Sequence, residues 1–289
     1  MSRRRESAPS NASCSQKVEY EMAYTPYDWQ QTLRQKADYV EDRLRGGSPV
    51  VGLSCQTGVL LLTTRRTQRK IFEIYDRLAF AGLGNPSDLE TVRQLSVDFA
   101  HAEGYQRSPD DVSIQRVVGL AISPTLKRSF ADPFRTPLVL RGLFAQTGDR
   151  ADDDLFFALN YDGEFLLQQQ HAVAAGTEFA EQQMRRVLTE RETKRKSKTA
   201  SPLELAEAIE KALQAWATGR WALRAGISQS DKRPEKEQVA ETPSAREIQE
   251  VLSEELEEGT LEAAVLERDP KRERRLRLLS EEELARFLP

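Results

Sequence analysis

The feature that most limits the fold of this chain is a pair of apolar runs at residues 50–53 and 59–62. Gln56-Thr57-Gly58 stands between them, and glycine takes up a positive φ with little strain, as tight turns require. The pattern therefore predicts a β-hairpin. Neither run alternates polar with apolar residues as a half-exposed strand does, so we expect both faces of this sheet to be covered.

The rest of the chain predicts strands and helices in alternating blocks. Further strands are expected at residues 71–75, 78–83, 137–146, 154–161, 164–167, 171–174, 261–267 and 274–279. Helices are expected at residues 25–45, 87–103, 108–124, 177–190, from 201 onward, 244–257 and 280–288. Strand blocks separated by pairs of helices predict an α+β fold, a four-layer αββα sandwich in which helices cover the outer face of each sheet.

Several helix boundaries follow from local chemistry. Thr25 before Pro26 reads as a cap at the start of the first helix. Ser87 with Glu90 reads as a capping box, and Pro124 is expected to kink or end a later helix. On the helix from residue 87, the buried face is expected to comprise Leu89, Val92, Leu95 and Phe99.

The first helix carries an apolar stripe and ends at Gly46-Gly47. Trp29, Leu33 and Val40 lie on one face at helical spacing. A helix buried in the core and a helix that contacts a neighbouring subunit both require such a stripe. The stripe alone therefore predicts an amphipathic helix and leaves those two alternatives open.

Composition excludes several classes of function. The 289 residues carry a net charge of −4, which gives no general attraction to nucleic acid. Two histidines and two cysteines provide no spacing for a metal site, and we expect no metal or cofactor. No apolar run reaches the length of a membrane span, and the charged amino terminus lacks the apolar core of a signal peptide. A cytoplasmic protein without membrane contact is expected.

The chain is expected to form one main domain with two polar additions. Residues 1–24 read as a flexible tail, and Met22 is an alternative start. The domain covers residues 25–289, and residues 226–259 read as a polar insertion because they combine a proline-containing stretch with an acidic helix.

The opening motifs resemble those of a known family. GSPVVGL at residues 47–53, GVLLL at 58–62 and KIFEIYDR at 70–77 are similar to the start of a proteasome core subunit. The alpha-type subunits of actinobacterial 20S proteasomes are the nearest likeness. Matching motifs occur at residues 110–116, 161–163, 176–178, 261–266 and 280–288, so the resemblance covers about residues 25–225 and 260–288. It implies the N-terminal-nucleophile hydrolase fold.

The resemblance places Ser48 where catalytic beta-type subunits have their nucleophile. Such enzymes use the first residue, whose free amine is the general base. Gly47 before Ser48 suits a self-cleavage site, so a self-processed serine hydrolase is the alternative function. Three features oppose it: the nitrogen of Ser48 is an amide in the intact chain, Thr64 stands at the position of the catalytic acid, and Ala175-Gly176-Thr177 replaces the Ser-Gly-Ser of active subunits.

Lys70 is the residue to which the resemblance gives a binding role. The matching lysine of alpha-type subunits lines a pocket between neighbours and pairs with the terminal carboxylate of an activator. Such a charge-assisted contact contributes about 1.5–3 kcal/mol when partly shielded. The alternative is a solvated lysine beside Arg69.

The resemblance as a whole implies a structural and gating subunit without catalysis of its own. It implies a homo-heptameric ring in contact with beta-type subunits, a gate formed by residues 1–24, a hexameric ATPase activator and protein substrates. Trp29, Leu33 and Val40 would then lie on a helix that contacts neighbouring subunits. A scaffold of the same fold with an unrelated partner is a further alternative.

Overall fold

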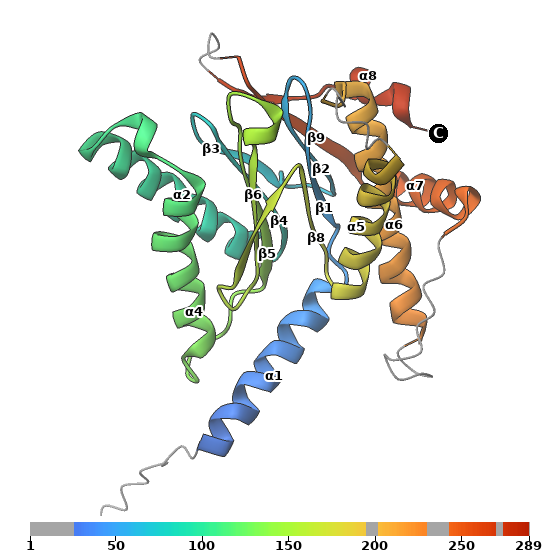
Figure 1. Ribbon diagram of the computed structural model, residues 1–289. Helices are drawn as coiled ribbons and strands as arrows, with labels where there is room; N and C mark the ends of the chain where they lie inside the picture. The colour runs from blue at the N-terminus through green and yellow to red at the C-terminus, as the bar shows by residue number, and fades with distance from the viewer. Residues whose placement is uncertain (1–25, 195–201, 230–242, 270–273, 289) are drawn as a thin grey trace, which may run out of the picture.

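Two antiparallel five-stranded sheets form the centre of the computed structural model, which describes residues 26–194, 202–229, 243–269 and 274–288 (Figure 1). The first sheet has the order β10-β9-β2-β1-β8, with β1 (Val50–Ser54), β2 (Gly58–Arg65), β8 (His171–Ala174), β9 (Thr260–Glu267) and β10 (Leu276–Leu278). The second has the order β3-β4-β5-β6-β7, with β3 (Ile71–Tyr75), β4 (Leu78–Gly84), β5 (Leu140–Gln146), β6 (Leu155–Leu159) and β7 (Phe165–Gln169).

Helices cover the outer face of each sheet. The first sheet is covered by α5 (Glu178–Lys194) and α6 (Leu205–Gln229), with α7 (Ala245–Glu258), α8 (Glu281–Leu284) and the 3-10 turn η5 (Ala285–Phe287) beside them. The second is covered by α2 (Pro86–Gln106), η1 (Pro109–Asp111), α3 (Ile114–Arg116), η2 (Val117–Ile122) and α4 (Ser123–Ala131). A short turn, η3 (Ala151–Asp153), precedes β6. The predicted four-layer sandwich is confirmed.

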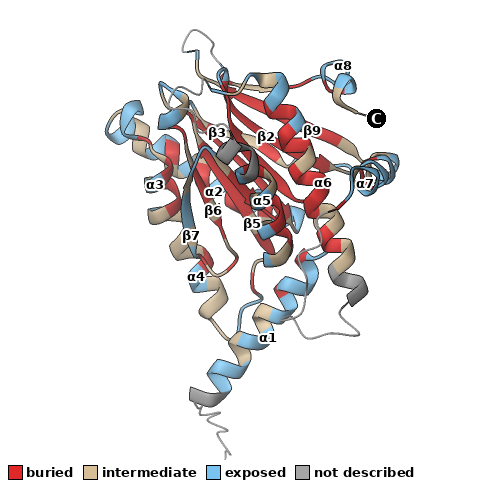
Figure 2. Cartoon of the chain, turned by 45° about the vertical axis from the view of Figure 1, so that its right-hand side comes forward, coloured by how far each residue is buried: buried red, intermediate tan, exposed pale blue. Residues whose placement is uncertain are grey.

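Three apolar cores separate the four layers, and they appear as the red interior of Figure 2. Alternate residues of β1 supply two of them: Val50 packs between the sheets, whereas Val51 and Leu53 pack under α6. This arrangement explains the unbroken apolar runs, because both faces of the first sheet are buried.

The predicted hairpin forms as expected, with Leu53 opposite Leu60 in an antiparallel register. Gly58 has φ +154°, and a Cβ at this position would lie 2.0 Å from the carbonyl oxygen of Leu266. Glycine is therefore required here both by the backbone conformation and by the close approach of β9.

The start and the buried face of α2 differ from the prediction. Asn85, not Ser87, is the N-cap, and its side chain accepts a hydrogen bond from the Ser87 amide at 3.0 Å. Leu95 is exposed, while Ser96 and Ala100 are fully buried. The small side chains let the helix approach the second sheet closely. A helical pattern that counts only large apolar residues misses these positions.

Pro124 does not end its helix. Residues 117–122 form a π-helical segment in which the Ser123 amide bonds to the Val118 carbonyl, and α4 continues to Ala131. Pro124 lies in the first turn of α4, where the missing N–H of proline is least costly.

The region predicted as a polar insertion contains a packed helix. α7 is capped by Ser244 and Glu247, and its Val251 and Leu252 are buried. It contacts α6 through ion pairs, among them Arg224 with Glu255 at 2.7 Å. α6 itself begins at Leu205, later than predicted, and residue 201, where this helix was expected to start, lies outside the described residues.

The first helix, α1 (Pro26–Leu44), projects from one end of the sandwich (Figure 1). Val40 and Leu44 at its base are fully buried, whereas Leu33 is half-buried and Trp29 is 37% exposed. The predicted cap Thr25 and the tail of residues 1–24 lie outside the described residues. The apolar stripe therefore has an inner half that is part of the core and an outer half that is not.

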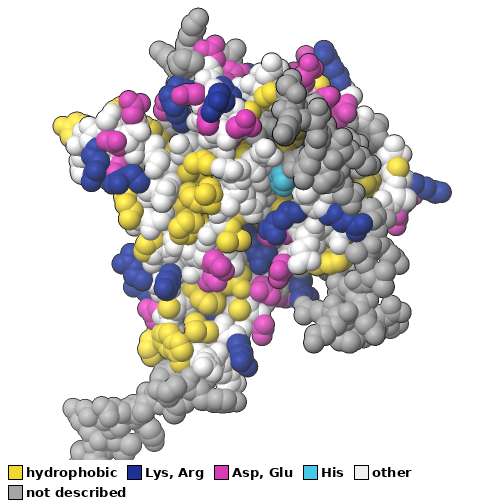
Figure 3. Space-filling model, in the orientation of Figure 1, with side chains coloured by type: hydrophobic (Ala, Val, Ile, Leu, Met, Phe, Trp, Pro, Cys, Tyr) yellow, Lys and Arg dark blue, Asp and Glu magenta, His cyan; other side chains and the backbone are white. Residues whose placement is uncertain are grey.

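None of the helices in the described ranges is long and apolar enough to cross a membrane. On the face shown in Figure 3, acidic and basic side chains are interspersed among the described residues.

Candidate functional site

Ser48 lies just before β1, and polar groups surround its hydroxyl. Its Oγ is 2.7 Å from the Thr64 hydroxyl and 3.3 Å from the Thr63 hydroxyl. It accepts hydrogen bonds from the Trp216 Nε1–H at 3.1 Å and from the Thr64 amide at 3.2 Å. The residues matched to the nucleophile and the acid thus meet in space.

Two of these partners donate N–H groups to the Ser48 hydroxyl. A serine hydroxyl has two lone pairs, and here two N–H donors point at them. The hydroxyl at Thr64 cannot hold a negative charge, so it cannot stabilise a protonated base as a carboxylate would. The contacts of Ser48 thus tie it to β2 and α6.

The backbone ahead of Ser48 is held in place by hydrogen bonds. The Gly47 amide donates to the Leu44 carbonyl at 2.8 Å, and Arg220 Nη1 donates to the Gly47 carbonyl at 3.3 Å. Gly176 packs against the end of α1, where a Cβ would lie 2.2 Å from the Leu44 carbonyl oxygen. The end of α1 therefore lies directly against the turn at Gly176.

The turn at Ala175-Gly176-Thr177 is held by ion pairs and backbone bonds. The Glu181 carboxylate accepts from the Ala175 amide at 3.1 Å, and Arg141 Nη1 donates to the Ala175 carbonyl at 2.9 Å. Burial raises the pKa of Glu181, and the charges of Arg141 and Arg185 lower it in part. Thr177 accepts from the Ala180 amide at 3.3 Å and so begins α5.

Lys70 stands at the start of β3, next to a buried carboxylate. The amides of Lys70 and Ile71 donate to Glu262 of β9 at 3.0 and 3.2 Å. Burial raises the pKa of Glu262, which is 5% exposed, and these amide bonds oppose the shift. The carboxylate thereby fixes the backbone from which the Lys70 side chain extends.

The ammonium group of Lys70 is electrostatically unusual. Desolvation lowers its pKa to about 8; Glu262 and Glu255 raise the value in part, while Arg220 and Arg66 lower it further. Within the described ranges, no carboxylate forms an ion pair with this lysine. A desolvated cation without an ion-pair partner favours an incoming anion.

Arg220 connects the surroundings of Ser48 and Lys70. It donates to the Gly47 carbonyl, pairs with Glu255 of α7, and affects the pKa of Lys70 through its charge. The sequence alone does not indicate a role for Arg220, Glu255 or Glu262 at these sites. They are distant in the chain from Ser48 and Lys70, and no local motif indicates the contacts.

Comparisons with known proteins show which family the chain resembles. Residues 44–220 match the family model described as "Proteasome subunit". The chain is 31% identical to a protein named proteasome subunit alpha from Actinosynnema mirum, over 84% of this chain and 79% of that protein. It is 29% identical to one of the same name from Kineococcus radiotolerans, over 75% of this chain and 88% of that protein.

Proposed function

Since the chain belongs to the proteasome subunit family, within its alpha-type group, we propose that it is the structural and gating subunit of a core particle and performs no hydrolysis itself. The observation that carries the proposal is the contact of Ser48 with the Thr64 hydroxyl at the position where hydrolysis would require a carboxylate. The hydrogen bonds of the Gly47 amide and carbonyl support it, because they hold the segment ahead of Ser48 against the fold.

The proposal includes a homo-heptameric ring stacked on beta-type subunits in the cytoplasm. The outer half of α1 supports a role in the ring, because Trp29 and Leu33 extend the apolar stripe beyond the core of the single chain. Residues 1–24 precede this helix and would form the gate through which protein substrates pass. Val40, which is fully buried, would anchor the helix to its own subunit.

Co-expression with a beta-type subunit of the same genome tests this function. We expect a stacked-ring particle in electron microscopy, peptidase activity only when the beta-type subunit is present, and an intact mass that retains the Gly47–Ser48 bond. The chain purified alone should be inactive. A chain that stays monomeric and does not bind the beta-type subunit would refute the proposal. A mature form that begins at Ser48 would favour the self-processed hydrolase.

Lys70 is proposed to receive the terminal carboxylate of a hexameric ATPase activator. The support is its lowered pKa and its lack of a carboxylate ion-pair partner within the described ranges. A fixed ammonium opposite a carboxylate contributes about 1.5–3 kcal/mol.

The lowered pKa of Lys70 predicts a pH dependence of activator binding. The side chain is cationic below about pH 8 and neutral above it, so affinity for a carboxylate-ended peptide should fall as the pH rises through that value. An unperturbed lysine would retain its charge to about pH 10. Fluorescence anisotropy can measure the binding of such a peptide to assembled rings between about pH 7 and about pH 9.5, which is roughly the range in which this side chain titrates.

The matched control is Lys70→Arg, which stays charged throughout this range. We expect its binding to change little with pH. If the wild-type and Lys70→Arg rings show the same pH profile, Lys70 does not bind the carboxylate.

A further inference from the structure

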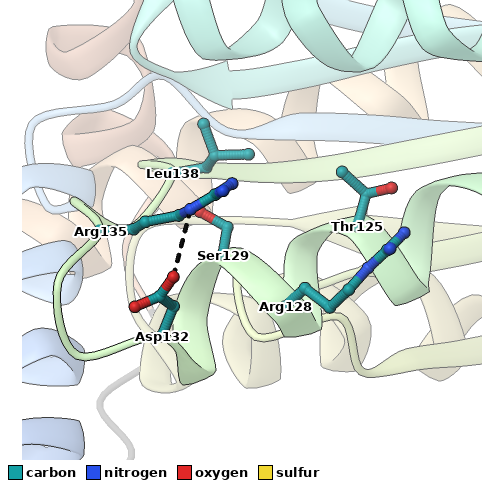
Figure 4. Close-up of a pocket in the computed structure, with 6 residues that line it drawn as sticks. All are labelled: Thr125, Arg128, Ser129, Asp132, Arg135 and Leu138. Carbon is teal, nitrogen blue, oxygen red and sulfur yellow. Dashed lines mark ion pairs between the residues drawn. The ribbon is translucent and has the colours of Figure 1, made fainter.

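A pocket of about 630 Å³ lies beside the last turns of α4 and the loop that leads to β5 (Figure 4). Its wall consists of Thr125, Arg128, Ser129, Asp132, Arg135 and Leu138. The volume is within the range of about 300–1,000 Å³ typical of sites for small ligands. The proposed function does not involve this pocket.

The two arginines of the pocket differ in their contacts. Arg135 Nε pairs with Asp132 at 3.2 Å, as the dashed line in Figure 4 marks. Arg128 is exposed and donates its Nε–H to the Pro124 carbonyl at 3.2 Å. Within the described ranges, Arg128 forms no ion pair, so its terminal N–H groups are available for a planar oxyanion.

The pocket also contains hydrogen-bond acceptors. The Thr125 hydroxyl donates to the Ala121 carbonyl at 2.8 Å, and the Ser129 hydroxyl to the Thr136 carbonyl at 3.5 Å. Because each hydroxyl has already used its proton, its oxygen can accept an N–H from a ligand. The Asp132 carboxylate adds a stronger acceptor, and Leu138 provides an apolar wall.

This mixture of groups favours a peptide over a phosphate compound. Arg135 is already paired with Asp132, so Arg128 is the guanidinium of the pocket wall that remains for one carboxylate. A peptide provides both the carboxylate that Arg128 binds and the N–H groups that the acceptors bind.

The loop of the pocket is tied to α1. The ammonium of Lys36 donates to the carbonyls of Phe130 and Arg135 at 3.4 and 2.7 Å, and also to the carbonyl of Asp132. A ligand that orders this loop would therefore also strengthen its attachment to α1.

We propose that this pocket is a second binding site, which takes a peptide segment of a partner protein through a carboxylate on Arg128 and N–H groups on Asp132 and Ser129. The carboxylate belongs either to an acidic side chain or to a chain terminus. The site does not depend on the proposed role of Lys70.

Three rhodamine-labelled peptides and the purified full chain test this proposal by fluorescence anisotropy. Gly-Ala-Leu-Glu amide carries only a side-chain carboxylate, Gly-Ala-Leu-Gln acid only a terminal one, and Gly-Ala-Leu-Gln amide neither. We expect at least one acidic peptide to bind with a Kd below about 1 mM, and the neutral peptide to bind at least about tenfold more weakly.

The decisive variant is Arg128→Gln, and Lys127→Gln is its matched control. Lys127 is the neighbouring exposed cation, but it does not line the pocket. Arg128→Gln should raise the Kd of the acidic peptide at least about tenfold, whereas Lys127→Gln should change this Kd less than about twofold. Equal losses in the two variants would overturn the proposal. So would equal binding of the neutral peptide, the absence of binding by both acidic peptides, or displacement by inorganic phosphate at the same concentration as unlabelled peptide.

Discussion

Replacing Arg268 with methionine is expected to lower the free energy of unfolding by about 3–5 kcal/mol. Arg268 follows β9 and binds the fully buried Asp154 with both terminal nitrogens, at 2.6 and 2.9 Å. The same guanidinium donates to the carbonyls of Gly148 and Cys55, each at 2.9 Å. Without it, the carboxylate of Asp154 remains in the interior without a counter-charge.

Asp154 has other ties that explain why it stays buried in the variant. It accepts from the Gly148 amide at 2.9 Å and from the hydroxyl of Ser54, and these bonds hold the carboxylate at the end of β1. Since these bonds do not supply a positive charge, they reduce the penalty without removing it. The loss in free energy of unfolding is therefore expected to be as large as that typical of a buried ion pair that has lost one partner.

Urea unfolding followed by far-UV circular dichroism gives the measurement. Arg150→Met is the control, because the Arg150–Asp153 pair lies in the same loop region but on the surface, and its arginine side chain is 78% exposed. The control should unfold at the wild-type midpoint. Equal midpoints for Arg268→Met and Arg150→Met would show that Asp154 does not need its partner.

Replacing Trp216 with alanine is expected to cost about 3–5 kcal/mol. Trp216 is fully buried on α6, in the core under the first sheet, and it is among the largest side chains enclosed there. The truncation leaves a cavity among tightly packed neighbours, and it removes the N–H donor that binds the Ser48 hydroxyl.

Trp216→Phe separates the two effects. Phenylalanine keeps most of the apolar volume but loses the N–H, so the expected cost is about 1 kcal/mol for the hydrogen bond plus a small packing loss. Thermal unfolding of both variants provides the comparison. Equal losses in the two variants would mean that the polar contact with Ser48, not the packing, dominates the role of Trp216.

The sequence predicts the sheets better than it predicts the helix ends. The apolar runs around Gly58 determine β1 and β2, because burial on both faces leaves no other arrangement of so many adjacent apolar residues. The sequence favours Ser87 as the cap of α2, but Asn85 is the cap in the structure, since both residues suit a cap and only the packed structure selects one. The π-helical turn before Pro124 has no local signature of its own.

The candidate sites were predictable only where the motif is local. Ser48 and Thr64 lie in one hairpin, so their contact follows from its register. The other partners come from elsewhere in the chain. Trp216, which donates to Ser48, and Arg220, which donates to the Gly47 carbonyl, belong to α6, and Glu262, which accepts from the Lys70 amide, belongs to β9. Such contacts depend on how the layers stack, which a single sequence does not specify.

The joint between α1 and the sandwich has a mechanical consequence. Two consecutive glycines suggest a flexible joint, but the amide and the carbonyl of Gly47 are both hydrogen-bonded. Gly176 also packs against the end of α1. The 19 residues of α1 form a rod of about 28 Å, so a tilt of about 10° at its base displaces the tip by roughly 5 Å. A small rotation at the base of α1 therefore produces a large displacement of the far end of the helix, while the helix itself stays straight.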